Sequence, residues 1–280
     1  MNSVEDMFAG GMFSISSRSK NTRKKNTTHD ISAKKAAAAT AVQISELVEK
    51  KATLEKHLEE AKGFFTYKIQ QVVDILTPVF LLPPASESSQ SNPTLTLEGE
   101  LATRIREINS LAMIELFRHT NHFKEFQWQE LVGLFSMFTA INVADEKKVN
   151  EPLADYKDTH PLKLAAKFLE DRLLFYQNEE SIRQLNTGSE YEIQYDILEP
   201  IMRWTECSDE SECRAVLSSL LLNQGVFVGE FVRAVLKINK IAEEMESVAS
   251  FVGDIELMAK LKLIGPNILK YVCTNQSLYV

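Results

Sequence analysis

Three basic residues in the last quarter of the sequence have the spacing of a surface that could bind an anionic polymer. Residues 228–240 read VGEFVRAVLKINK, which places Arg233, Lys237 and Lys240 at positions i, i+4 and i+7. In a helix these positions share one face. The apolar residues between them fill much of the remaining surface, so the cations would line a groove beside the core. The pattern predicts either a track for backbone phosphates or a solvated helix edge that binds nothing.

No other residues form a recognisable catalytic or metal-binding motif. The sequence has no GxxxxGK[ST] loop, GxSxG turn, HExxH helix or EF-hand loop. We therefore predict no enzymatic activity, no catalytic residues, no cofactor and no metal for this chain alone. His119 and His122 lack further ligands at matching spacing, so we interpret them as polar surface. Cys207 and Cys213 flank an acidic turn that disfavours a thiolate, and we interpret them as inert thiols.

A second basic segment lies near the N-terminus. Residues 18–35 contain seven cations and the single acid Asp30. The cations are Arg18, Lys20, Arg23, Lys24, Lys25, Lys34 and Lys35. Residues 1–30 have little apolar periodicity, so we predict a disordered basic tail that binds nucleic acid or an acidic partner. Since the whole chain carries a net charge of −8, any contact with nucleic acid must be local.

Composition indicates a folded protein of a reducing compartment. The chain has 280 residues, of which 44% are hydrophobic and 25% charged, close to the globular average. Its three cysteines are odd in number and form no CxxC pair, which favours an intracellular location, cytoplasmic or nuclear, or a virion or virus-factory component if the protein is viral. No apolar run reaches about 18 residues, so we predict no membrane segment.

Apolar periodicity predicts an all-α or nearly all-α fold. A long stalk-like helix is expected over residues 31–62, and a second helix over 66–80 that stops at Pro83-Pro84. A short β-wing around Leu95–Leu97 is the only strand candidate. Further helices are predicted over 96–117 (one or two), 128–143, 161–178, 191–206, 210–246, 254–263 and 266–273. The predicted division is a tail (1–30), the two helices (31–82), a loop (83–94) and a helical domain (95–280).

An aromatic cluster within the predicted domain has two interpretations. It comprises Phe123, Phe126, Trp128, Phe135 and Phe138. Such rings could stack on unpaired bases, but at helical spacing they are more often core. We therefore predict that they are buried.

The closing residues of the chain resemble those of a known family. Residues 225–280, which end in Ser277-Leu278-Tyr279-Val280, resemble the last helices of the superkiller/Mtr-type DExH RNA helicases. Residues 96–138, with Gly99, Ala102 and the run Ile105 to Asn109, resemble the start of the same DSH C-terminal domain. Residues 46–76 are similar to the helix by which those proteins return from an inserted stalk. The family's nucleotide-binding domains have no counterpart in these 280 residues.

This resemblance implies contact with single-stranded RNA. In such helicases a ratchet helix of the C-terminal domain touches the emerging strand, and here it would be the helix around Glu230 to Met245. Arg233 and Lys237 fall on basic positions of the family. The implied partners are single-stranded RNA and a separate helicase motor chain. The alternative is a structural or scaffold protein that has kept the fold and binds nucleic acid or a protein partner.

Overall fold

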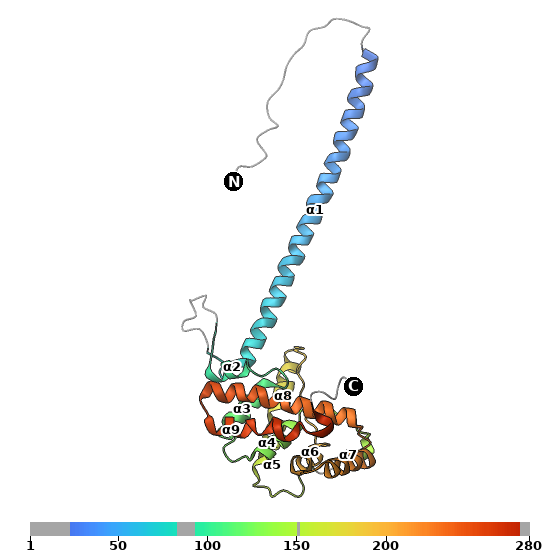
Figure 1. Cartoon of the computed structure of the whole chain (residues 1–280). Helices are drawn as coiled ribbons and strands as arrows, with labels where there is room; N and C mark the ends of the chain where they lie inside the picture. The colour runs from blue at the N-terminus through green and yellow to red at the C-terminus, as the bar shows by residue number, and fades with distance from the viewer. Residues whose placement is uncertain (1–22, 83–92, 150–151, 275–280) are drawn as a thin grey trace. The chain divides into compact units, whose positions relative to one another are not determined.

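The computed structural model describes residues 23–82, 93–149 and 152–274, with side chains described from residue 40 onward. The described chain divides into two units, one ending at Tyr67 and one beginning at Lys68. Each unit is considered by itself. Helices dominate both, so the predicted all-α class is confirmed (Figure 1).

The first unit consists of most of one long helix. Helix α1 runs without a break from Arg23 to Leu76, where the sequence predicted two helices separated near residue 64. Gly63 is the only helix-weakening residue there, and one glycine costs about 1 kcal/mol, too little to stop a helix. Thr66 satisfies its hydroxyl by donating to the carbonyl of Lys62 at 3.0 Å. Residues 23–30, predicted to belong to a disordered tail, are the first turns of this helix.

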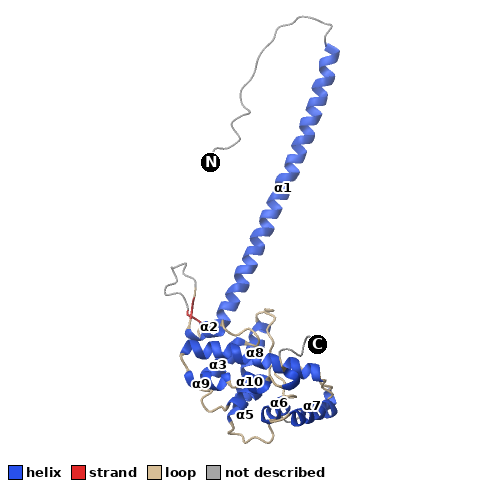
Figure 2. Ribbon diagram, in the orientation of Figure 1, coloured by secondary structure: helices blue, strands red, loops and turns tan. Residues whose placement is uncertain are grey.

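A two-stranded antiparallel pair follows α1 in the second unit (Figure 2). Strand β1, Leu81–Leu82, pairs with β2, Thr94–Leu95, in the register Leu81 to Leu95. The predicted β-wing around Leu95–Leu97 is thus confirmed at its first residue, whereas Leu97 already opens helix α2, Leu97–Ala102. The hydroxyl oxygen of Thr96 caps this helix by accepting the Gly99 N–H at 3.0 Å.

The remaining helices form the body of the second unit. They are α3 (Ser110–His119), α4 (Trp128–Ser136), α5 (Pro161–Ile182), α6 (Leu198–Glu206), α7 (Glu210–Gln224), α8 (Val228–Val252), α9 (Ile255–Lys262) and α10 (Ile264–Ile268), with 3-10 turns at Asp145–Lys147 and Tyr271–Cys273. Helix α8 packs against α4, α9 and α10, and α4 packs against α6. The longest helix of this body therefore contacts three of the other helices.

Two predicted helices are shorter in the structure because their ends bond to each other. Helix α4 ends at Ser136 instead of continuing to residue 143, and α6 begins at Leu198 instead of Tyr191. The backbone N–H of Gln194 donates to the carbonyl of Met137 at 2.7 Å. The Gln194 side-chain oxygen accepts the N–H of Ile141 at 2.9 Å. These long-range bonds satisfy backbone groups that a helix would have used.

Aromatic residues fill the core of the second unit. Phe123, Phe126, Phe135 and Phe138 are buried and Trp128 is partly buried, so the predicted packing role of this cluster is confirmed. Trp204 lies edge-on to Phe231 with ring centroids 5.2 Å apart, and its indole N–H donates to the carbonyl of Ile268 at 2.9 Å.

Within the described residues, no single helix is long and apolar enough to span a membrane. Only α7 and α8 taken together, across a bend of 112°, have sufficient length and apolar composition. The apolar faces of these two helices are buried inside the unit.

Gly99 is predicted to be indispensable for the junction of β1 and α2. A Cβ atom at this position would lie 2.2 Å from the carbonyl oxygen of Phe80, which is backbone and cannot swing away. We expect Gly99→Ala to lower the free energy of unfolding by at least about 2 kcal/mol, measured by urea denaturation. Gly229→Ala is the control, because nothing lies within 4 Å of its added Cβ. Equal stabilities of the two variants would contradict this account of the junction.

Candidate nucleic-acid interface

Helix α8 provides the scaffold on which the three predicted cations lie. Its buried face contains residues at helical spacing: Phe231, Val232, Ala234, Val235, Ile238, Ile241, Ala242, Met245, Val248 and Ala249. At its start, the Glu230 carboxylate accepts the backbone N–H of Phe227 at 3.5 Å. At its end, Gly253 adopts a left-handed conformation with φ of 74°, which glycine tolerates best. The helix is thus continuous through all three cations.

Arg233, Lys237 and Lys240 lie outside that buried face, as their spacing predicts. The Arg233 side chain is 73% exposed and that of Lys240 is 54% exposed. The Lys237 side chain is only 26% exposed, because it lies against another segment. The structure therefore brings the three together on one helix, with Lys237 the most enclosed.

Each of these cations has a carboxylate nearby. The Arg233 guanidinium is 3.9 Å from Glu230, and the Lys240 ammonium is 3.4 Å from Glu243. The Lys237 ammonium is 3.7 Å from Glu190, which belongs to the segment before α6. The Glu230 and Glu243 pairs are visible as i,i+3 spacings in the sequence. The Glu190 pair joins distant residues, and sequence reasoning missed it.

The next residue in the same series, Glu244, has a structural role. Its carboxylate accepts the backbone N–H groups of Arg106 at 3.0 Å and Glu107 at 3.1 Å. Position 244 follows 233, 237 and 240 at helical spacing, so its place on this face could have been read from the sequence. The carboxylate fixes the segment between α2 and α3 against α8.

A pocket of about 440 Å³ lies beside this face within the second unit. Its walls come from the last turns of α1, from residues 105–111, and from the loop 187–191. Glu190, the partner of Lys237, belongs to that loop and also lines a neighbouring pocket of about 380 Å³. Lys237 thus reaches the rim of both pockets through Glu190, whereas no residue of α8 lines either of them.

A buried network supports the pocket from behind. The Glu115 carboxylate on α3 pairs with the Arg172 guanidinium on α5, with Nε to Oε2 at 3.0 Å. It also accepts a hydrogen bond from the hydroxyl of Tyr176, a residue that lines the pocket. Burial, together with the adjacent Glu115 carboxylate, raises the pKa of Tyr176. The phenol therefore stays protonated and donates. The sequence signal for this network was Glu115 itself, a single acid within the apolar run AMIELF at residues 112–117.

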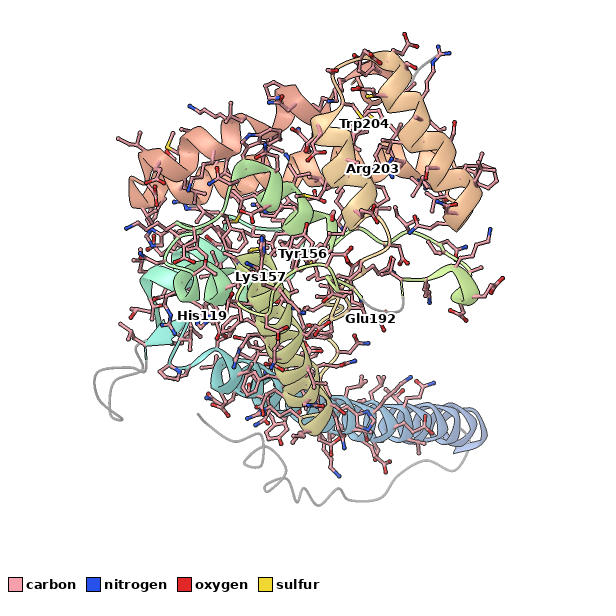
Figure 3. All side chains as sticks on the ribbon, turned by 90° about the horizontal axis from the view of Figure 1, so that it is seen from below. His119, Tyr156, Lys157, Glu192, Arg203 and Trp204 are labelled. Atoms are coloured by element: carbon pink, nitrogen blue, oxygen red, sulfur yellow. The ribbon has the colours of Figure 1, made fainter. Side chains whose placement is uncertain are left out.

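A third hollow, of about 340 Å³, is acidic and unsuited to phosphate. It lies between Val149, residues 152–156, α6 and α7, near Tyr156 and Arg203 in Figure 3. Its ionisable lining consists of Asp155, Tyr156, Tyr195, Asp196, Glu199, Arg203 and Glu206. Burial, and then the charge of Glu130, raises the pKa of Tyr156, with Glu199 and Glu206 adding to the effect. An anionic ligand would meet repulsion here.

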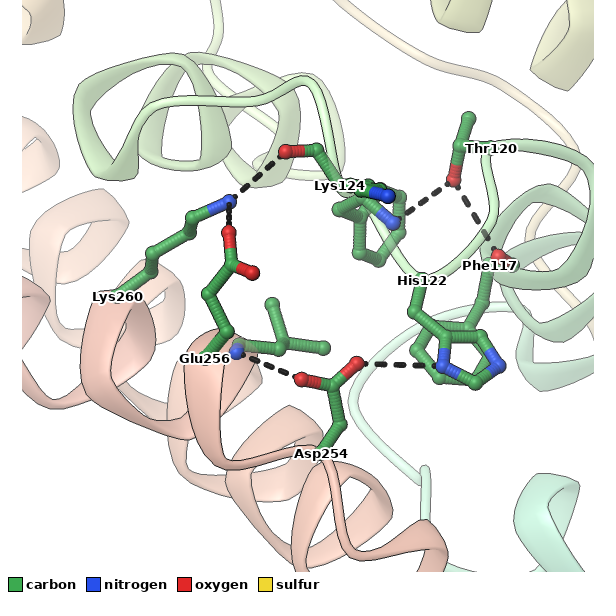
Figure 4. Close-up of polar contacts among 9 residues, drawn as sticks. Phe117, Thr120, His122, Lys124, Asp254, Glu256 and Lys260 are labelled. Atoms are coloured by element: carbon green, nitrogen blue, oxygen red, sulfur yellow. Dashed lines mark hydrogen bonds and ion pairs between the residues drawn. The ribbon is translucent and has the colours of Figure 1, made fainter.

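The two histidines stack on phenylalanines and do not face each other. His119 stacks on Phe168 and His122 on Phe117, each with ring centroids 4.3 Å apart. The His122 Nδ1 also lies 3.2 Å from the Asp254 carboxylate, which joins the loop before α4 to the start of α9 (Figure 4). Among the described residues, no group of three or more His, Cys, Asp or Glu side chains could hold a metal ion.

The cysteines are free thiols. Cys213 and Cys273 are buried and Cys207 is half-buried. Burial raises the pKa of Cys213 and of Cys273 to about 12 in each case. Cys213 and Cys273 therefore behave as small core residues, which for Cys213 agrees with its interpretation as an inert thiol.

The predicted basic tail falls partly outside the described residues. Arg18 and Lys20 lie outside them, whereas the other five cations, Arg23, Lys24, Lys25, Lys34 and Lys35, lie in the first turns of α1. Their role in binding remains a prediction.

The buried network should be a major determinant of stability. We expect Glu115→Ala to lower the free energy of unfolding by about 3 kcal/mol, because it leaves the Arg172 guanidinium and the Tyr176 hydroxyl without their acceptor. Asp158→Ala is the control. It removes an exposed carboxylate that lies 2.9 Å from Lys163, and should leave the free energy of unfolding nearly unchanged. Similar losses in both variants, measured by urea denaturation, would refute the assignment.

Comparison with known proteins adds one finding. Residues 92–273, more than half of the chain, match the DSHCT (NUC185) domain family. No curated protein sequence matches the chain.

Proposed function

Since the chain belongs to the DSHCT (NUC185) domain family, a non-catalytic C-terminal domain of DExH-type helicases, we propose that it is the RNA-contacting module of such a helicase. The ATPase motor would be supplied by sequence outside these 280 residues. The observation that carries the proposal is the row of Arg233, Lys237 and Lys240 on the face of α8 opposite its buried residues, with Arg233 and Lys240 exposed and Lys237 partly covered.

The ion pairs on this row are loose enough to exchange for phosphate. The three nitrogen-to-oxygen distances are between 3.4 and 3.9 Å. Surface pairs of this kind contribute roughly 0–1 kcal/mol each, since water and salt screen them. A phosphate group can replace a carboxylate beside each cation with little loss of stability.

The expected mode of binding is weak and independent of sequence. Cations on a rigid helix neutralise backbone phosphates and read no base edges. Because the chain is acidic overall, binding would be confined to this row and would fall steeply with salt. For three neutralised phosphates of a single strand, the slope of log affinity against log salt should be roughly −2.

A second candidate function is a non-catalytic scaffold. The observation that favours it is the carboxylate beside each cation, which leaves the row with little net positive charge. A scaffold would use the same fold to bind a protein partner and would show no binding to RNA through α8.

The proposal predicts that removing the cations weakens RNA binding. We expect Arg233→Ala combined with Lys237→Ala to lower the affinity for a short single-stranded RNA roughly tenfold and to bring the salt slope to about −1. Fluorescence anisotropy of a labelled RNA across a salt series measures both quantities. Arg214→Ala combined with Lys163→Ala removes two cations paired with exposed carboxylates elsewhere and should leave both unchanged. Unchanged binding in the α8 variant would exclude this interface.

A truncation distinguishes RNA binding by α8 from RNA binding by the N-terminal basic segment. Deletion of residues 1–35 removes all seven cations of that segment and leaves the second unit intact. We expect salt-sensitive RNA binding to survive the deletion, measured by the same anisotropy titration. Loss of all binding with the deletion would favour the scaffold candidate with a basic tail.

A further inference from the structure

Helix α1 exposes large apolar side chains at heptad spacing. Ile44, Leu47, Leu54, Leu58 and Phe65 are between 54% and 66% exposed. In a heptad abcdefg that begins with Ile44 at a, these residues and Ala61 occupy a and d positions, and only Lys51 interrupts the series. A repeat of 3.5 residues is the signature of a seam that faces another helix.

The opposite side of the same segment is mostly polar and charged. Its b, c and f positions include Ser45, Glu46, Glu49, Thr53, Lys56, Glu59 and Glu60. All of these are exposed. The apolar stripe is therefore narrow, as in a coiled coil, and not the broad face of a helix that packs on a globular core.

The seam is hollowed where a partner's side chain would insert. A shallow groove of about 300 Å³ lies along it. The groove is lined by Leu47, Lys50, Lys51, Leu54, Glu55 and Leu58. Holes bounded by a and d residues are where the knobs of a facing helix pack.

We propose that residues 44–65 of α1 pair with the same residues of a second copy of this chain, as a parallel, in-register, two-stranded coiled coil. Ile at a with Leu at d, as in Ile44 and Leu47, favours two parallel strands. A single lysine at an a position, here Lys51, is a feature that fixes register and number of strands at some cost in stability.

Charges at the flanks of the seam select the parallel orientation. Lys50 is at g and Glu55 is at e, so in a parallel pair each Lys50 faces Glu55 of the second copy, twice by symmetry. An antiparallel pair that sets Ile44 of one helix level with Ala61 of the other would instead place Lys50 beside His57 and Glu55 beside Val48. The Lys50–Glu55 attraction thus forms only in the parallel pair, in which the next flanking contact, His57 with Lys62, contributes no attraction.

The length of the seam sets the expected strength of association. Residues 44–65 extend about 33 Å at 1.5 Å per residue, and two such helices would bury on the order of 1,000 Å² in total. This lies at the lower limit for stable interfaces. The dimer should therefore dissociate reversibly at micromolar concentration. It does not depend on RNA binding by α8.

The first test is the molar mass of the full chain, measured by sedimentation velocity from about 1 to 100 μM, the range in which a micromolar dimer forms. We expect the mass to rise from 31.7 kDa toward twice that value. Leu54→Glu should keep the chain monomeric throughout the range. Thr53→Glu adds the same charge on the outer side and should leave the dimer unchanged. Circular dichroism verifies that both variants keep their helices.

The second test uses the paired charges. Lys50→Glu alone and Glu55→Lys alone should each weaken self-association, since each creates two repulsive contacts. A mixture of the two variants should form the mixed dimer in preference to either homodimer, because both contacts between positions 50 and 55 are then attractive. A chain that is monomeric at every concentration, a dimer that survives Leu54→Glu, or a mixture without preference would each overturn the proposal.

Discussion

Helix α8 buries one face against α4, α9 and α10, and this burial determines which of its side chains remain in solvent. Its buried residues include Phe231, Val235, Ile238 and Met245. A helix of 25 residues held along this length cannot rotate without exposing large apolar area. The position of Arg233, Lys237 and Lys240 is therefore a consequence of core packing. Fixed positions of the cations are what a rigid surface needs if a polymer is to move along it.

Polar contacts then join the surrounding segments to this helix. Glu244 holds residues 106 and 107 through their backbone N–H groups, and Lys237 pairs with Glu190 of the loop before α6. The Glu115–Arg172–Tyr176 network fixes α3 against α5 behind the same pocket. Packing positions the helix, and these contacts position the walls beside it. The chain is negatively charged overall, but its acidic hollow, which includes Asp155 and Glu206, is formed by segments other than α8. The negative charge is therefore compatible with a local interface on α8.

Local patterns predicted the helices and the core well, and long-range bonds explain where they did not. The spacing within 228–240 placed Arg233, Lys237 and Lys240 outside the buried face of α8 correctly, and the phenylalanines around Phe126 and Phe135 are buried as expected. The single helix predicted over 210–246 is two helices, because the chain turns at Gly225, whose φ is 77°. The early end of α4 and late start of α6 depend on Gln194, whose bonds to Met137 and Ile141 join residues more than 50 positions apart. Likewise, the partner of Lys237 lies 47 positions before it, and no spacing rule finds it. In α1 the difference is local: the helices predicted over 31–62 and 66–80 are one, because Gly63 between them costs a helix only about 1 kcal/mol.

The central claim is that the solvent side of α8, beside the 187–191 loop, is where single-stranded RNA lies. Its most direct test is amide hydrogen exchange of the full chain, measured by mass spectrometry with and without a short single-stranded RNA at low salt. We predict that exchange slows in peptides from the loop 187–191 and from the segment 105–109, both of which adjoin α8, and that it is unchanged in peptides around the acidic hollow of α6 and α7. Protection confined to residues before Tyr67, or no protection at saturating RNA, would contradict the account.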